Sequence, residues 1–120
     1  MTSDIGVDNL VGLQLVAVNF VLDYYVLQFR NTWFLTILNP ISVSSSGATT
    51  REGDDQFRNC LCGQIEKAVK VVEVTDNSLK IEFEDGSSID VSLAHDDYEG
   101  RPEAVVINGP NNFLAVIRDE

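Results

Sequence analysis

Positive charge is scarce in this sequence. Its 120 residues include 8 Lys or Arg against 19 Asp or Glu, which gives a formal net charge of −11. Proteins that bind nucleic acids or anionic membranes neutralise phosphates with Lys and Arg, so neither class of partner is expected. A basic protein partner suits this charge, although an acidic surface can also serve solubility alone.

Histidine and catalytic motifs are equally scarce. His95 is the sole histidine, and no G-x-S-x-G, P-loop or G-x-G-x-x-G motif is present. The run His95-Asp96-Asp97 could supply metal ligands or an acid–base pair, but adjacent loop residues point apart. We therefore expect no catalytic residue, no metal and no cofactor. A small enzyme that uses acidic residues or His95 remains a third hypothesis for the function.

Cysteine is limited to Cys60 and Cys62. A disulfide across one intervening residue would be strained, and no second pair completes a zinc site, so free thiols in a reducing compartment are expected. Asp4 and Asp8 stand where a signal peptide carries positive charge. The uncharged stretch 9–22 is too short to span a bilayer. These features predict a cytoplasmic protein with no membrane partner.

What the sequence does have is apolar residues that alternate with polar ones, which is typical of strands with one wet face. The segment 79–93 shows this best. A three-residue loop, Glu84-Asp85-Gly86, pairs Ile81 with Ile89 and Leu79 with Val91, whereas a two-residue loop would mix the faces. Gly86 then takes the left-handed position of a bulged hairpin.

A further strand at 68–75 precedes this hairpin, so residues 64–93 form a three-stranded meander. The first half, 1–41, repeats the pattern with an insertion or deletion of three residues. Duplication or convergent strand patterning would both produce this similarity. The matched segments are Leu10-Val11-Gly12 with Leu61-Cys62-Gly63, Ala17-Val18 with Ala68-Val69, Leu27-Gln28-Phe29 with Ile81-Glu82-Phe83, and Leu35-Thr36-Ile37 with Ile89-Asp90-Val91.

The two meanders are joined by residues 42–63, where a polar loop at 42–50 leads into a short helix at 54–62. We expect Asp54 or Asp55 to cap its start and Gly63 to end it in the left-handed conformation.

Residues 94–120 hold an acidic loop and a C-terminal hairpin. Its strands, 104–107 and 113–117, flank the turn Asn108-Gly109-Pro110. The chain is thus predicted to be a single mainly β domain over 1–120. It would be an antiparallel sandwich or half-open barrel built from two duplicated three-stranded meanders, a C-terminal hairpin and one short helix.

Acidic residues concentrate in one segment, since eight of them lie between positions 82 and 103. If the outward side chains of the second meander continue into the acidic loop, they form a negative face that could dock a basic protein; the alternative is a solvated face. The predicted partner-binding residues are Glu82, Glu84, Asp90, Asp96, Asp97, Tyr98 and Glu99.

The first half, by contrast, has strands that are apolar on both faces. Tyr24 and Tyr25 are adjacent, as are Trp33 and Phe34, so each pair must point to opposite sides of a strand. Such strands are either covered twice or part of an interface. A homodimer through these four residues is therefore the second hypothesis.

The repeated strand pairs, the Leu61-Cys62-Gly63 motif and the late Asn108-Gly109-Pro110 turn are similar to those of small uncharacterised bacterial domains. The acidic, compact, β-rich character resembles immunity proteins of contact-dependent and other polymorphic toxin systems. This resemblance implies a non-enzymatic protein that binds and neutralises one cognate toxin, often a basic nuclease. It assigns no role to any single residue.

Overall fold

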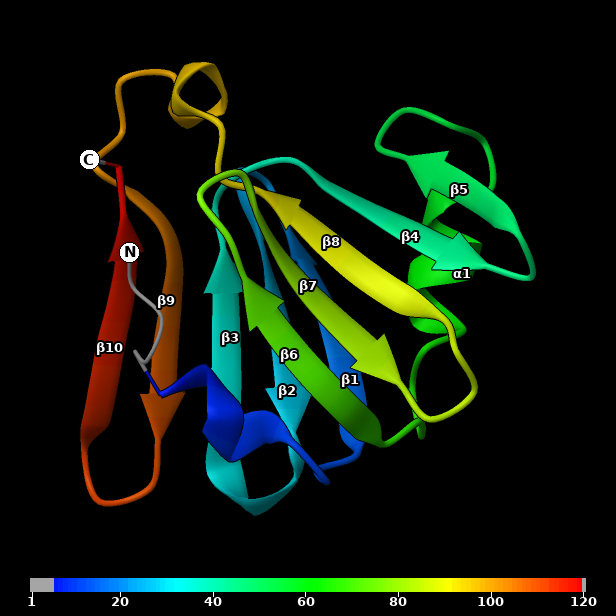
Figure 1. Ribbon diagram of the computed structural model, residues 1–120, viewed down its shortest axis with the longest axis horizontal. Helices are drawn as coiled ribbons and strands as arrows, with labels where there is room; N and C mark the ends of the chain where they lie inside the picture. Colours follow the sequence, from blue (N-terminus) through cyan, green and yellow to red (C-terminus); the bar gives the residue numbers. More distant parts are fainter. Residues whose placement is uncertain (1–5, 120) are drawn as a thin grey trace.

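The computed structural model describes residues 6–119, so residues 1–5, which include Asp4, and Glu120 lie outside the described part (Figure 1). Two five-stranded antiparallel sheets face each other as a sandwich. The first sheet has the order β1 (Leu15–Val21), β2 (Tyr24–Phe29), β3 (Trp33–Ile37), β9 (Glu103–Gly109) and β10 (Phe113–Arg118). The second has the order β5 (Ala48–Arg51), β4 (Ile41–Ser45), β8 (Ser88–Ser92), β7 (Ser78–Phe83) and β6 (Val69–Val74). Helical segments are η1 (Val7–Leu10), η2 (Arg30–Thr32), α1 (Phe57–Cys62) and η3 (His95–Tyr98).

The second meander has the register predicted from its alternation. Ile81 pairs with Ile89 and Leu79 with Val91 across β7 and β8. Gly86 has φ 90°, the left-handed conformation that the three-residue loop requires. The meander prediction is therefore confirmed in strand order and in pairing, and its inward residues are fully buried.

The two meanders are related by an approximate twofold axis. Leu15 pairs with Phe29 and Val69 pairs with Phe83, so counterparts stand 54 positions apart (15 and 69, 29 and 83). The two sheets meet at a single antiparallel bridge between Gln14 and Ala68, which are themselves counterparts (14 and 68). A pair of equivalent residues can bond to each other in this way only where the symmetry axis passes between them.

Hydrogen bonds around this axis repeat as well. Gly12 N donates to Val69 O over 2.8 Å, and Glu66 N donates to Leu15 O over 2.7 Å. Gly12 has φ 87° and its counterpart Glu66 has φ 85°. The backbone of the second repeat thus keeps the conformation of the first even where glycine is replaced.

The two repeats exchange their last hairpins. β4 follows the first meander in sequence but pairs with β8 of the second, and β9 follows the second meander but pairs with β3 of the first. Figure 1 shows the β9–β10 hairpin beside β3 at one end and the β4–β5 hairpin beside β8 at the other. Each sheet therefore contains strands from both halves of the chain, so the described residues of both halves build one sandwich.

Predictions for the strands and for the helix ends were wrong. Residues 42–50 are a hairpin rather than a loop, since Ser42, Val43 and Ser44 pair with β5 on one side and β8 on the other. Ser and Thr are accepted there because they occupy the wet face of a sheet. The matches of 10–12 to 61–63 and of 17–18 to 68–69 are both off by three residues, because the bulge in each first strand follows Leu15 in one repeat and Val69 in the other. The offset of 54 holds from these segments to β3 and β8, so the predicted insertion or deletion of three residues was wrong as well.

The predicted helix ends were also wrong. α1 begins at Phe57 after Gln56, and no side chain caps it. Asp54 instead accepts a hydrogen bond from Arg51 N over 2.8 Å, which closes the turn after β5. Gly63 has φ −65°, so it continues right-handed rather than reversing the chain.

Candidate functional site

The outer face of the second sheet carries several of the predicted acidic residues, but it is not uniformly negative. Across the sheet, Lys80 pairs with Glu73 on one side and with Asp90 on the other. Asp90 in turn pairs with Ser42, and Ser42 with Arg51. Neighbours on one face lie about 5 Å apart, so charges of opposite sign alternate along this row. The negative face predicted from the sequence is thus interrupted by Lys80 and Arg51.

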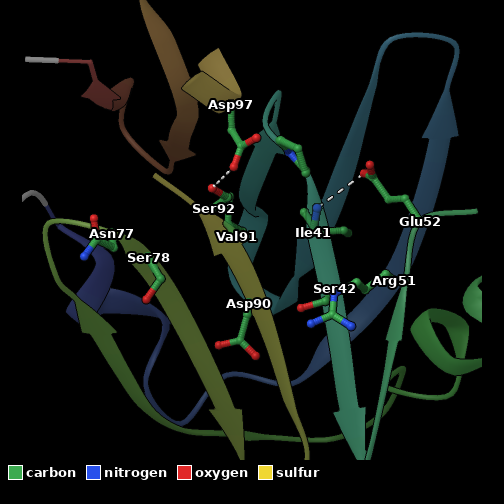
Figure 2. Close-up of a pocket in the computed structure, with 11 residues that line it drawn as sticks. Ile41, Ser42, Arg51, Glu52, Asn77, Ser78, Asp90, Val91, Ser92 and Asp97 are labelled. Atoms are coloured by element: carbon green, nitrogen blue, oxygen red, sulfur yellow. Dashed lines mark hydrogen bonds between the residues drawn. The ribbon is translucent and has the colours of Figure 1, made fainter. Parts of the chain in front are cut away.

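At one end of this face lies a groove of about 460 Å³ (Figure 2). Three carboxylates surround it, from three different elements: Asp90 on β8, Asp97 on η3 and Glu52 after β5. Arg51 is the one basic residue in the lining. The complete lining is Pro40, Ile41, Ser42, Arg51, Glu52, Asn77, Ser78, Asp90, Val91, Ser92 and Asp97.

A buried hydrogen-bond network holds Asp97 at the groove. Arg101 Nη2 donates to Leu38 O, to Asn39 Oδ1 and to Asp97 O over 2.8, 3.0 and 3.2 Å. Asn39 is 1% exposed, and its amide donates to Ser92 O over 2.9 Å. The η3 segment is thereby fastened to the end of β8, and the Asp97 carboxylate accepts a bond from Ser92 Oγ.

Glu52 is held from the opposite side of the groove. Its Oε2 atom accepts hydrogen bonds from Tyr25 Oη over 2.8 Å and from Ile41 N over 3.3 Å. Burial of Tyr25 and its bond to the Glu52 carboxylate raise the pKa of Tyr25, because the charged phenolate would be desolvated and repelled. Tyr25 therefore stays protonated and acts as a donor to Glu52.

The carboxylates of this groove form no salt bridge with the described basic residues. Among residues 6–119, the salt bridges join Lys67 to Asp85 at 2.8 Å, His95 to Asp119 at 2.7 Å, and Arg101 to Glu99 at 3.7 Å. None of them involves Glu52, Asp90 or Asp97. The groove thus has three carboxylates against one guanidinium, a net charge that favours a cationic group.

The other predicted contact residues are distributed differently. Glu82 lies on the outer face near the β7–β8 turn, and Glu84 is exposed in that turn, at the opposite end of β8 from Asp97. Asp96 and Glu99 are exposed beside Asp97. Tyr98 is only 2% exposed and belongs to the hydrophobic core, so its predicted place at the edge of the face was wrong.

The Asp85 carboxylate is already committed to a local network. Hydrogen bonds from Lys67 and Ser87 hold the pKa of Asp85 well below its usual range. Lys67 Nζ also donates to Ser87 Oγ over 3.1 Å, and Ser87 Oγ donates to Gln64 Oε1 over 2.7 Å. This network ties the β7–β8 turn to the segment after α1.

A second hollow, of about 650 Å³, opens between the β1–β2 turn, α1 and the start of β4. Phe20, Tyr25 and Phe57 form its aromatic wall, with ring centroids 5.8 and 6.0 Å apart in edge-to-face contacts. Arg58 lies over the Phe20 ring at 4.8 Å. Glu52 lines both hollows, so the aromatic wall supports the acidic groove from behind.

The aromatic residues predicted to form a dimer separate onto two faces. Tyr25 points inward to Glu52, and Trp33 packs on Phe113 with ring centroids 5.1 Å apart. Tyr24 and Phe34 point to the outer face of the first sheet, because they alternate with these inward residues.

The described residues contain no group of three His, Cys, Asp or Glu side chains that could hold a metal ion. The His95 side chain is 81% exposed, and its bond to Asp119 raises the pKa of His95. Cys60 is half-buried, Cys62 is exposed, and both are free thiols.

Within residues 6–119, no helix has the length and apolar character needed to cross a membrane. Comparisons with protein-family models, with characterised proteins and with solved structures found no match. The geometry of the described residues therefore carries the functional argument.

Asp90 and Asp97 are the lining residues that the sequence predicted, and the charged residues Arg51 and Glu52 were missed. Arg51 reaches the groove because it is the last residue of strand β5 and pairs with Ser42, and Glu52 follows it directly. Because residues 42–50 were predicted to be a loop, the sequence offered no strand register that could place Arg51 and Glu52 at the groove.

Proposed function

We propose that this protein is a non-enzymatic binding module for a basic protein, and most concretely an immunity protein that neutralises a cognate toxin by occlusion. The observation that carries the proposal is the groove with three carboxylates that form no ion pair with the described basic residues. The resemblance to acidic β-rich immunity proteins supplies the biological role. The free thiols of Cys60 and Cys62 suit a cytoplasmic protein of this kind.

The binding mechanism follows from the charges around the groove. A Lys or Arg side chain of the partner would enter it and donate hydrogen bonds to the carboxylates that line it, Asp90, Asp97 or Glu52. Charge-assisted hydrogen bonds of this type are about twice as strong as neutral ones. Asp96 and Glu99, exposed on the same segment as Asp97, would draw the partner toward the groove, and the net charge of −11 would raise the association rate. Glu82 and Glu84 would add contacts if the partner reaches the β7–β8 turn.

The test begins with co-expression of this chain and the basic proteins encoded beside it. We expect one of them to co-purify in a stoichiometric complex and to lose its toxicity. If no neighbouring product binds, the proposal is wrong.

Two charge-neutralising variants then locate the contact. Asp90→Asn combined with Asp97→Asn keeps the shapes of both side chains and should weaken binding by about tenfold or more, since tenfold corresponds to about 1.4 kcal/mol. The matched control is Asp55→Asn with Glu73→Gln, which removes the same charge from exposed sites outside the groove lining. The control should change only the association rate at low salt. Equal loss in both variants would show that net charge, and not the groove, drives binding.

A further inference from the structure

The outer face of the first sheet carries no charge over its two central rows. Across β1, β2, β3, β9 and β10, the first row is Asn19, Val26, Thr36, Val106 and Val116, and the second is Ala17, Gln28, Phe34, Asn108 and Leu114. All of these side chains alternate with buried or partly buried residues and so point away from the core. None of the ten is fully buried, and Leu114 is 62% exposed.

The second sheet holds different residues at the same positions. Its rows, read from β6 to β5, are Glu73, Lys80, Asp90, Ser42 and Arg51, and then Val71, Glu82, Ser88, Ser44 and Thr49. Through the twofold axis, Val26 corresponds to Lys80, Thr36 to Asp90 and Phe34 to Ser88. On the exchanged hairpins, Val116 corresponds to Arg51 and Leu114 to Thr49.

The two outer faces differ in their side chains although their backbones follow the same pattern. Both faces are built on one backbone pattern, and the second sheet folds with charged and hydroxyl side chains at these positions. The fold therefore does not require apolar residues there. The difference extends to the hairpin tips, where Leu22 is 96% exposed and its counterpart is Asp76. A face whose rows hold Val26, Phe34, Val106, Leu114 and Val116 among uncharged polar side chains, none of them fully buried, is a candidate interaction surface.

We infer that this face binds the same face of a second copy of the chain, so that two sandwiches stack sheet on sheet. The distribution of charge decides where two copies can meet: each copy carries −11, but residues 1–50, which build most of this face, contain only Asp4, Asp8, Asp23 and Arg30 as charged residues. Contact through the two uncharged rows therefore brings no carboxylates of these rows together. Contact here keeps the acidic groove of each copy on the far side. A basic partner would find no carboxylate within the two rows.

The area of this face limits the size of the dimer interface. Five strands about 4.8 Å apart and about 20 Å long give a face of roughly 480 Å², so two copies bury about 1,000 Å². This lies at the lower limit for specific interfaces. An interface of this size favours a weak dimer, in which the facing sheets are separated by about 10 Å.

Sedimentation velocity from about 1 to 500 µM tests the inference. We expect a monomer at the low end, a dimer at the high end, and a tighter dimer in high salt, because salt screens the repulsion between the two acidic copies. A monomer at every concentration and salt level would overturn the inference.

Variants copied from the opposite face keep the test independent of unfolding. Val26→Lys with Val116→Arg introduces the residues that the counterpart positions hold, and it should abolish the dimer while the circular dichroism spectrum stays unchanged. The control, Glu73→Lys on the outer face of the second sheet, should leave the dimer intact.

Concentration-dependent methyl NMR shifts in the wild-type chain give a second readout. They should be confined to residues such as Val106, Leu114 and Val116. Shifts on the second sheet instead would overturn the inference. These measurements use this chain alone, so their outcome is separate from that of the partner assay.

Discussion

The left-handed backbone shared by Gly12 and Glu66 gives a direct test of the twofold relation. Gly12 has φ 87° and open space around its missing Cβ, so Gly12→Ala meets no steric contact. An L-residue in this conformation costs about 1–2 kcal/mol, and the lower entropy of the unfolded chain returns about 0.4–1 kcal/mol. Gly12→Ala should therefore destabilise the protein by about 1 kcal/mol. Glu66→Gly should change the free energy of unfolding in the opposite direction, with a gain of up to about 1 kcal/mol.

Urea denaturation followed by tryptophan fluorescence measures both effects. With a slope of about 1.5 kcal/mol per molar, a change of 1 kcal/mol moves the midpoint by about 0.7 M. Glu66→Ala is the control, because it removes the same side chain and keeps the left-handed backbone; its midpoint should match the wild type. If Glu66→Ala stabilises as much as Glu66→Gly, the gain comes from the lost carboxylate, and the argument from backbone strain fails.

Three further predictions concern ionisation and packing. The pKa of His95 lies above 6.5 because Asp119 stabilises the charged imidazole. The stabilisation of the fold by this ion pair is therefore complete below pH 6.5 and is lost as the pH rises through the folded-state pKa. In an NMR titration, Asp119→Asn should bring the pKa of His95 down toward 6.5. Gly109→Ala places a Cβ 2.6 Å from the ring of Trp33, which should cost about 1–3 kcal/mol and shift the fluorescence emission, and an unchanged spectrum and midpoint would contradict this contact. Phe83→Ala empties a fully buried site and should cost about 3–5 kcal/mol in urea denaturation, whereas a loss below 1 kcal/mol would show that the site collapses freely.

Local patterns were enough to predict the second meander. The alternation around Ile81 and Ile89 is strict, and only one loop length keeps both strands facing the core. Gly86 supplies the conformation that this loop needs. Register, turn and burial are thus determined within about fifteen consecutive residues, which is why the prediction was correct in detail.

The hairpin exchange could not be predicted in the same way. Whether β4 pairs with β3 or with β8 depends on which sheet edge is free after both meanders have formed, and that is a contact between residues nearly fifty positions apart, such as Ile41 and Val91. The strand Ile41–Ser45 is also rich in serine, so its composition matched a loop as well as an outward-facing strand.

The acidic site was predicted in composition but not in geometry. Counting acids between positions 82 and 103 located Asp90 and Asp97, yet proximity in sequence also suggested Tyr98, which the core buries. Glu52 was missed because a hydrogen bond from Tyr25, 27 positions away, holds it beside the groove. A site assembled from three elements has no signature in any one of them.

The two proposals, taken together, constrain the architecture of a complex. The groove lies on the outer face of the second sheet, and the inferred dimer interface lies on the outer face of the first, so the thickness of the sandwich separates them. Dimerisation therefore leaves both grooves open and directed away from each other. A dimer would then bind two copies of a basic partner. The positive charge of each bound partner would offset the negative charge of its protomer and so reduce the repulsion between the two acidic protomers. Partner binding and dimerisation should consequently strengthen each other at low salt and become independent in high salt, where charge repulsion is screened.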